Sequence, residues 1–226
     1  CEVVAYGLEE GDYTANNIEF LPTGIAFDIK TNEGLRGRLS VPLYGRHNVL
    51  NSLASVAGAS GEGLGFDQIK KAAAGFKGTY RRFNILTAPE DPIAVIDDYA
   101  HHPTEVKTTL EAAKLHFPER WLVAVFRPHT YSRTKALLNE YQTVFSQADK
   151  VYITDVEGAR EAAHKRIVSG ADIVAGLDSN AVFEPDRAKL VESIAAGARP
   201  GDVILCMTVS GYDAIAQELA KRLNTM

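Results

Sequence analysis

From residue 92 onward, short apolar runs alternate with longer amphipathic segments. Each run has the length of a strand, and the segment after it repeats its apolar residues at helical spacing. Repeated strand–helix units form a mostly parallel sheet with helices on both faces, which is an α/β fold. The apolar runs are residues 92–97, 121–126, 150–155, 181–185 and 202–209.

The first 44 residues follow another pattern, because apolar and polar residues alternate between Gly and Pro, as in short strands. Helical spacing then appears in residues 47–60 and 66–76. The segment 76–92 carries Gly, basic residues and Pro between periodic segments. We therefore predict a domain junction near Arg82, with a first domain at 1–81 and a second at 82–226.

Composition excludes several classes of protein. The 226 residues carry a net charge of −5, and without a long basic run this argues against nucleic-acid binding. No apolar stretch approaches the roughly 20 residues of a membrane span. Cys1 and Cys206 lack the spacing of a metal site and favour a reduced compartment. Because "CEVVAYG" begins like a strand without an initiator Met, we expect a longer protein.

Polar side chains gather where the predicted strands end. Ligands of open α/β sheets bind beyond the carboxyl ends of the strands. We expect the strands at 92–97 and 121–126 to be neighbours, so that the groups after them line one crevice. The side chains after four strands are Asp98, Tyr99, His101 and His102; Arg127, His129, Tyr131 and Arg133; Glu157, Arg160 and Glu161; and Ser210, Tyr212 and Asp213.

The adjacent His101 and His102 invite a metal interpretation. Neighbouring residues of an extended chain point in opposite directions, so joint ligation is awkward and we predict no metal site. We expect one of the two to cap the helix that opens at Pro103 and the other to face the crevice.

Two further groups near the second strand have competing interpretations. His129 is either a structural histidine or a crevice residue. Ser132 can cap the next helix, and Arg133 would lie in its first turn, where a positive charge opposes the helix dipole. A carboxylate or phosphate partner would explain that arginine. Ser210 lacks the G-x-S-x-G elbow of serine hydrolases.

The stretch "YGRHNVLNSLA" is a second dense cluster. Asn48 and Asn51 lie three residues apart and share a helix face. Asn48 is either an N-cap or, with Asn51 and His47, part of a surface that reads a purine edge, because an amide offers a donor and an acceptor together. The two arginines of "YRRF" are either a solvated pair or contacts for a phosphate or ribose.

Four motifs in this order resemble the Mur ligases, the ATP-dependent enzymes of peptidoglycan synthesis. They are "YGRHNVLNSLA", "GTYRRF", "IDDYAHHPTEV" and "VFRPHTYSRTKALL". The resemblance spans nearly the whole chain. It implies the end of a partial α/β ATPase (central) domain, with short strands and two helices, followed by a Rossmann-like C-terminal domain.

The resemblance also implies a reaction. ATP phosphorylates the carboxylate of UDP-N-acetylmuramate, and the amine of L-alanine attacks the acyl phosphate and expels phosphate. Mg²⁺ neutralises the phosphates, with metal ligands mostly outside this chain. The expected location is the cytoplasm, and the expected partner is the missing N-terminal part of the same protein.

The resemblance implies residue roles by position. The residues expected to contact adenine are His47, Asn48 and Asn51. Those expected to contact nucleotide phosphate or ribose are Arg82 and Asp98. Those expected to hold the amino acid or the developing charge are Tyr99, His101, His129 and Arg133.

The chain departs from the family pattern in three places. It lacks the phosphate loop G-x-x-x-x-G-K-[ST], so we expect it to be inactive alone. Thr130 stands where many relatives have arginine, and "CMTVSGYDAI" replaces an expected glycine-rich turn. Two alternatives stay open: a non-catalytic nucleotide-binding module derived from such a ligase, and the family member that recycles murein tripeptide.

Overall fold

The computed structural model divides the chain into two compact units, residues 1–79 and 80–226. It describes residues 3–161, 166–178, 180–209 and 214–223. The division falls inside the Gly- and Pro-containing segment 76–92, and each unit has its own apolar core. Within the described ranges, no helix is long and apolar enough to cross a bilayer.

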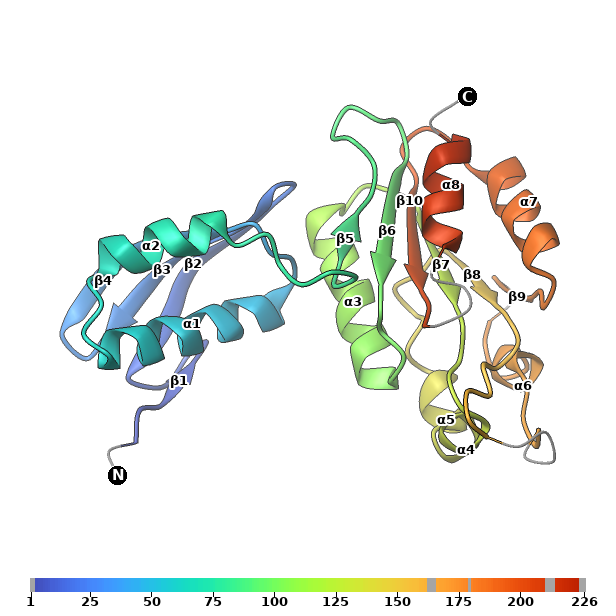
Figure 1. The fold of residues 1–226 in the computed structure, drawn as a ribbon, viewed down its shortest axis with the longest axis horizontal. Coiled ribbons are helices and arrows are strands. Elements are labelled where there is room, and N and C mark those ends of the chain that lie inside the picture. Colours follow the sequence, from blue (N-terminus) through green and yellow to red (C-terminus); the bar gives the residue numbers. More distant parts are fainter. Residues whose placement is uncertain (1–2, 162–165, 179, 210–213, 224–226) are drawn as a thin grey trace. The chain divides into compact units, whose positions relative to one another are not determined.

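The first unit contains a four-stranded sheet in the order β1-β2-β3-β4 (Figure 1). β2, β3 and β4 form an antiparallel meander, and the short β1 pairs in parallel with β2. Gly24, at the turn between β2 and β3, has a φ of 138°, and a Cβ there would collide with the Val41 carbonyl. The turn therefore requires glycine. The strands are β1 (Tyr6–Gly7), β2 (Tyr13–Leu21), β3 (Gly24–Thr31) and β4 (Gly34–Val41).

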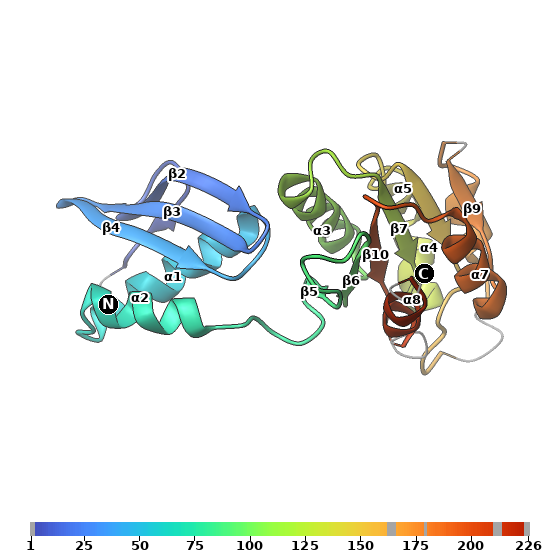
Figure 2. The same cartoon turned by 90° about the horizontal axis from the view of Figure 1, so that it is seen from above.

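Helices α1 (Arg46–Gly61) and α2 (Phe66–Gly75) cover one face of this sheet, as Figure 2 shows. Alternate residues of β3 point at the helices, and Phe27 and Ile29 are completely buried there. Burying a side chain of this size contributes about 1.5–3 kcal/mol, so the apolar face holds the unit together.

The second unit contains a six-stranded sheet in the order β5-β6-β10-β7-β8-β9. Five strands run parallel, and only the edge strand β5 is antiparallel to its neighbour. The predicted α/β class with a mostly parallel sheet is confirmed. The strands are β5 (Asn84–Ile85), β6 (Ala94–Asp98), β7 (Leu122–Phe126), β8 (Lys150–Ile153), β9 (Ala181–Phe183) and β10 (Val203–Met207).

Helices cover both faces of this sheet (Figures 1 and 2). One face packs against α7 and α8 through side chains such as Val95, Val125 and Ile204. On the other face, α3 contacts β7 and β10, and the ring of Tyr141 in α5 packs at a tilt against Phe126 of β7. The helices are α3 (Pro103–His116), α4 (Tyr131–Ala136), α5 (Leu138–Tyr141), α6 (Gly170–Val174), α7 (Arg187–Gly197) and α8 (Ile215–Leu223).

The predicted adjacency of β6 and β7 is wrong. β10 lies between them, and Met207 is the register partner of both Asp98 and Phe126. A buried parallel strand reads as an apolar run wherever it sits, so the sequence pattern carries no information about the order of the strands.

Candidate amino-acid and nucleotide site

The carboxyl ends of four parallel strands form one row. Met207 pairs with Asp98 on one side and with Phe126 on the other, and Phe126 pairs with Ile153. The polar segments that follow these strands therefore begin at the same edge of the sheet, which is the usual ligand edge of such folds. Ser210, Tyr212 and Asp213 lie outside the described residues.

Three rings meet above this row although β10 separates their strands. The ring centroids of Tyr99 and His101 are 5.6 Å apart, and those of His101 and His129 are 5.9 Å apart. Strands that are two positions apart are separated by about 10 Å. The chain after β6 crosses this gap because α3 packs on β10 and β7, and this carries His101 towards His129.

The two adjacent histidines have different functions, as the sequence predicted. His102 is the N-cap of α3, and its Nδ1 accepts a hydrogen bond from the Thr104 amide at 3.2 Å. His101 instead contacts the rings of Tyr99 and His129. The capping interpretation of one histidine is confirmed.

His129 and Arg133 each bury a polar atom that can serve a ligand. The His129 Nδ1 and the Arg133 Nη1 are buried and have no hydrogen-bond partner among the described residues. An unpaired buried polar group costs about 1–3 kcal/mol, so a ligand that pairs with it recovers that free energy. A carboxylate is such a ligand for the arginine fork.

Burial lowers the pKa of His129 below its usual value, and the positive charge of Arg133 lowers it further. Glu157 acts in the opposite direction but does not reverse the shift. His129 is therefore neutral at neutral pH, and the positive charge of this part of the site comes from Arg133.

The start of α4, which carries Arg133, is held by a residue from a distant loop. The predicted cap, Ser132, is wrong, because the N-cap position is Thr130, whose own side chain makes no capping hydrogen bond. The Glu161 carboxylate accepts hydrogen bonds from the amides of Tyr131 (2.6 Å) and Ser132 (3.1 Å), and from the Ser132 hydroxyl. Nothing in the local sequence pairs residue 161 with this helix.

Thr130 has a φ of 64°, a conformation that costs a β-branched residue about 1–3 kcal/mol. Its amide donates to the Glu157 carbonyl at 2.7 Å, and its carbonyl accepts from the amide of Thr134 at 3.0 Å. Such strain concentrates at functional sites. The conformation of Thr130 bends the chain sharply between His129 and Arg133.

Asp98 and Arg82, both predicted to contact nucleotide, differ in their surroundings. The Asp98 side chain is buried, and its oxygens accept from the amides of Phe83 (2.6 Å) and Ala100 (2.7 Å). This supports a structural function for Asp98, and its nucleotide contact stays a prediction. Arg82 is half-exposed and lies 3.6 Å from Glu105, so its guanidinium is accessible to an anion.

Sequence reasoning missed a buried ion pair beside them. The Arg81 guanidinium contacts both oxygens of Asp97, at 2.9 and 3.2 Å, and donates to the Thr208 carbonyl at 2.5 Å. Arg81 therefore ties the beginning of this unit to the ends of β6 and β10. The only signal was the Arg-Arg pair itself, which does not say which arginine turns inward.

Burial raises the pKa of Asp98 to about 6, although the Phe83 and Ala100 amides oppose the shift. A carboxyl with a raised folded-state pKa contributes stability that is fully present below its unfolded pKa of 3.8 and is lost as the pH rises through about 6. We expect this contribution, on the order of 3 kcal/mol, to vanish between pH 4 and pH 7. Urea unfolding of wild type and Asp98→Asn across this range measures it, and parallel curves for the two proteins would contradict it.

In the first unit, the three predicted adenine contacts form one hydrogen-bonded chain. The Asn48 amide nitrogen donates to the Tyr44 carbonyl (2.8 Å) and lies 3.1 Å from His47 Nε2, and its oxygen accepts from Asn51 (3.1 Å). The N-cap of α1 is Gly45, so the alternative of Asn48 as N-cap is wrong. His47 and Asn51 are exposed at the start of the helix.

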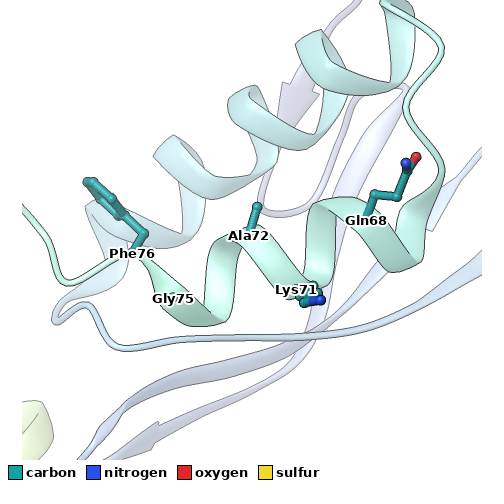
Figure 3. A pocket seen from close by; sticks show the side chains of 5 residues that line it. All are labelled: Gln68, Lys71, Ala72, Gly75 and Phe76. Carbon is teal, nitrogen blue, oxygen red and sulfur yellow. The ribbon is translucent and has the colours of Figure 1, made fainter.

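A surface hollow on α2 is separate from these groups. Figure 3 shows its lining, Gln68, Lys71, Ala72, Gly75 and Phe76, along a single helix. It contains none of the predicted site residues. Among the described residues there is also no group of three or more His, Cys, Asp or Glu that could hold a metal ion.

The second unit is thus a doubly wound α/β domain whose ligand edge carries histidines and an arginine, as suits an anionic small molecule. Two family models match the chain: "Mur ligase middle domain" over residues 1–59 and "Mur ligase, glutamate ligase domain" over residues 81–208. The chain belongs to the Mur ligase family.

Curated relatives agree with this assignment. The chain is 37% identical over 222 residues to a UDP-N-acetylmuramate–L-alanine ligase of Chlorobium phaeobacteroides, covering 95% of this chain and 48% of the relative. It is 41% identical over 217 residues to the protein of the same name from Acetivibrio thermocellus, covering 92% and 45%. The chain spans about half the length of these relatives.

Among solved structures, the UDP-N-acetylmuramate-alanine ligase of Thermotoga maritima matches with a TM-score of 0.78 and 27% identity, covering 98% of this chain and 48% of that one. A MurF from Acinetobacter baumannii matches with a TM-score of 0.74 at 18% identity, a likeness of fold alone.

Proposed function

We propose that the full-length protein is a cytoplasmic, ATP-dependent ligase that joins L-alanine to UDP-N-acetylmuramate through an acyl phosphate in peptidoglycan precursor synthesis. The observation that carries the proposal is the group of His101, His129 and Arg133 at the ligand edge, with two buried polar atoms available to an amino acid. The names of the relatives supply the identity of the substrates.

The geometry supports a division of labour. The Arg133 fork binds the α-carboxylate of alanine, and His129, neutral and adjacent, adds a hydrogen bond. Tyr99 and His101 border the same space. Positioning of this kind, together with charge stabilisation, supplies most of the rate enhancement in acyl and phosphoryl transfer.

ATP contacts are proposed for both units. In the first, His47, Asn48 and Asn51 would offer donors and acceptors to adenine. In the second, Arg82 and Asp98 would contact the nucleotide phosphate or ribose. Mg²⁺ accompanies ATP in the proposal, and most of its ligands would come from the N-terminal part of the full-length protein. The same part would supply the phosphate loop and the nucleotide-sugar site.

A phosphate-release assay tests the proposed function. The full-length gene product is incubated with UDP-N-acetylmuramate, ATP and each candidate amino acid, and we expect release that depends on L-alanine. Release that depends on the murein tripeptide would instead indicate the recycling ligase. An absence of release with every substrate, while ATP still binds, would indicate a non-catalytic nucleotide-binding module.

Replacing Asn48 or Asn51 by alanine in the full-length enzyme should raise the KM for ATP more than the KM for L-alanine. Each amide hydrogen bond to adenine contributes about 0.5–1.5 kcal/mol, which corresponds to a change of about two- to tenfold. Asn51→Ala is the cleaner variant, because Asn48 also donates to the Tyr44 carbonyl. A larger change for alanine than for ATP would contradict the adenine assignment.

A further inference from the structure

Glu105 connects groups that the proposed function assigns to different substrates. Its Oε2 accepts hydrogen bonds from the amides of His101 (3.0 Å) and His102 (3.1 Å), and lies 3.4 Å from the His101 Nδ1. Its Oε1 lies 3.6 Å from an Arg82 guanidinium nitrogen. Glu105 also completes the capping box of α3, which is a structural function that has to be separated from any other.

The surroundings of the His101 Nδ1 determine where the ring carries its proton. This nitrogen lies 2.9 Å from the Tyr99 carbonyl oxygen and 3.4 Å from the Glu105 carboxylate. A carbonyl and an ionised carboxylate only accept hydrogen bonds, so Nδ1 must be the donor. In the neutral ring, Nε2 then carries the lone pair.

The Glu105 carboxylate is ionised in this setting. Burial raises its pKa, but the hydrogen bonds from the His101 and His102 amides, together with the nearby Arg82 charge, outweigh burial and lower the pKa below its usual value. Glu105 therefore acts as an acceptor at neutral pH.

The opposite ring nitrogen is available to a ligand. No hydrogen bond reaches the His101 Nε2 from the part of the chain that the structure describes, and the side chain is 22% exposed. The rings of Tyr99 and His129 both contact the His101 ring. The positive charge of Arg133 is close enough to His129 to lower its pKa. The site therefore offers a lone pair on His101 and a guanidinium on Arg133, which suit the two ends of an amino acid.

We propose that Glu105 is a positioning residue of the amino-acid site: together with the Tyr99 carbonyl, it holds His101 as the Nδ1–H tautomer, so that Nε2 accepts a hydrogen bond from the substrate amine. The inference rests on the proposed ligase function. When the amine nitrogen bonds to the acyl carbon, its N–H bond breaks and the proton passes to Nε2. Phosphate leaves with the electron pair of the C–O bond, and Glu105 balances the imidazolium charge.

The tautomer can be measured on this 226-residue chain without substrates. Long-range ¹H–¹⁵N correlation NMR, at a pH where the ring is neutral, distinguishes a protonated Nδ1 from a protonated Nε2, and His101→Gln assigns the signals. We expect the proton on Nδ1. A ring that carries its proton on Nε2 overturns the proposal.

Kinetics of the full-length enzyme separate positioning from helix capping. Glu105→Gln keeps an oxygen that accepts from the two amides but loses the negative charge. Carboxylate partners of functional histidines contribute about 10–100-fold, so we expect Glu105→Gln to lower kcat about tenfold or more, with the KM for ATP nearly unchanged. Glu111→Gln removes an exposed charge from the same helix and should behave as wild type.

A failure of the inference and a failure of the proposed function would give different results. Wild-type kcat in Glu105→Gln means that Glu105 only caps α3, and this overturns the inference while the ligase assignment stands. If wild-type enzyme releases no phosphate with L-alanine, the proposed function fails, and the NMR measurement still decides the tautomer.

Discussion

Replacing Arg133 by alanine should raise the KM of the full-length enzyme for L-alanine about 10–100-fold, while the KM for ATP stays nearly unchanged. The Arg133 Nη1 is buried without a hydrogen-bond partner among the described residues, so the substrate carboxylate would supply its partner. Hydrogen bonds between charged groups contribute about 1.5–3 kcal/mol, which corresponds to this range. Initial-rate kinetics with each substrate varied in turn measures the effect.

Two variants control the Arg133 experiment. Arg133→Lys keeps the charge but loses the planar fork, and should fall between alanine and wild type. Lys135→Ala removes an exposed positive charge from the same short helix and should leave both KM values unchanged. An Arg133→Ala enzyme with the wild-type KM for alanine would exclude Arg133 from the amino-acid site.

Replacing Asp97 by alanine should lower the free energy of unfolding of the second unit by about 3–5 kcal/mol. The Arg81 side chain that pairs with it is 8% exposed, and Asp97 is fully buried. Removing one partner leaves a buried charge without compensation, and this costs far more than the pair itself contributes. Arg81 also adopts a left-handed φ of 57°, which the contacts with Asp97 and Thr208 help to hold.

The single tryptophan reports this effect selectively. Trp121 immediately precedes β7 in the second unit, so its fluorescence during urea titration follows that unit. Arg187→Ala, which breaks the exposed pair with Glu218, should change the free energy of unfolding by less than about 1 kcal/mol. If Asp97→Ala costs no more than this control, the buried pair does not hold the unit together.

The fold class could be predicted because strand and helix periods alternate from residue 92 onward. The order of the strands could not be predicted. The apolar sequence of β10 would suit an edge as well as the central position that the strand has in the sheet. Helical periodicity continues through residues 132–148, but the structure divides this segment into α4 and α5 at Leu137, where the sequence carries no Gly or Pro signal. Tertiary packing overrides local periodicity there.

Site residues could be predicted where a side chain is unfavourable or unusual at its position in the local secondary structure. Arg133 is one such residue, because its positive charge lies in the first turn of a helix, and the structure buries its Nη1. The two histidines before a proline are another example. Glu105 had a local signal, because a glutamate three residues after the N-cap His102 marks a capping box. Glu161 had no local signal, because its partner lies about 30 residues away. The Arg-Arg pair did not indicate that Arg81 contacts Asp97, 16 residues away.

The central place of β10 has a consequence for how this protein is made. Its residues leave the ribosome well after those of β6 and β7, yet they separate these two strands in the sheet. The nascent second unit therefore cannot close its sheet until β10 has been translated, and the apolar sides of the earlier strands stay accessible to chaperones in the meantime. A chain that stops before Val203 would lack the middle of its sheet and not merely an edge.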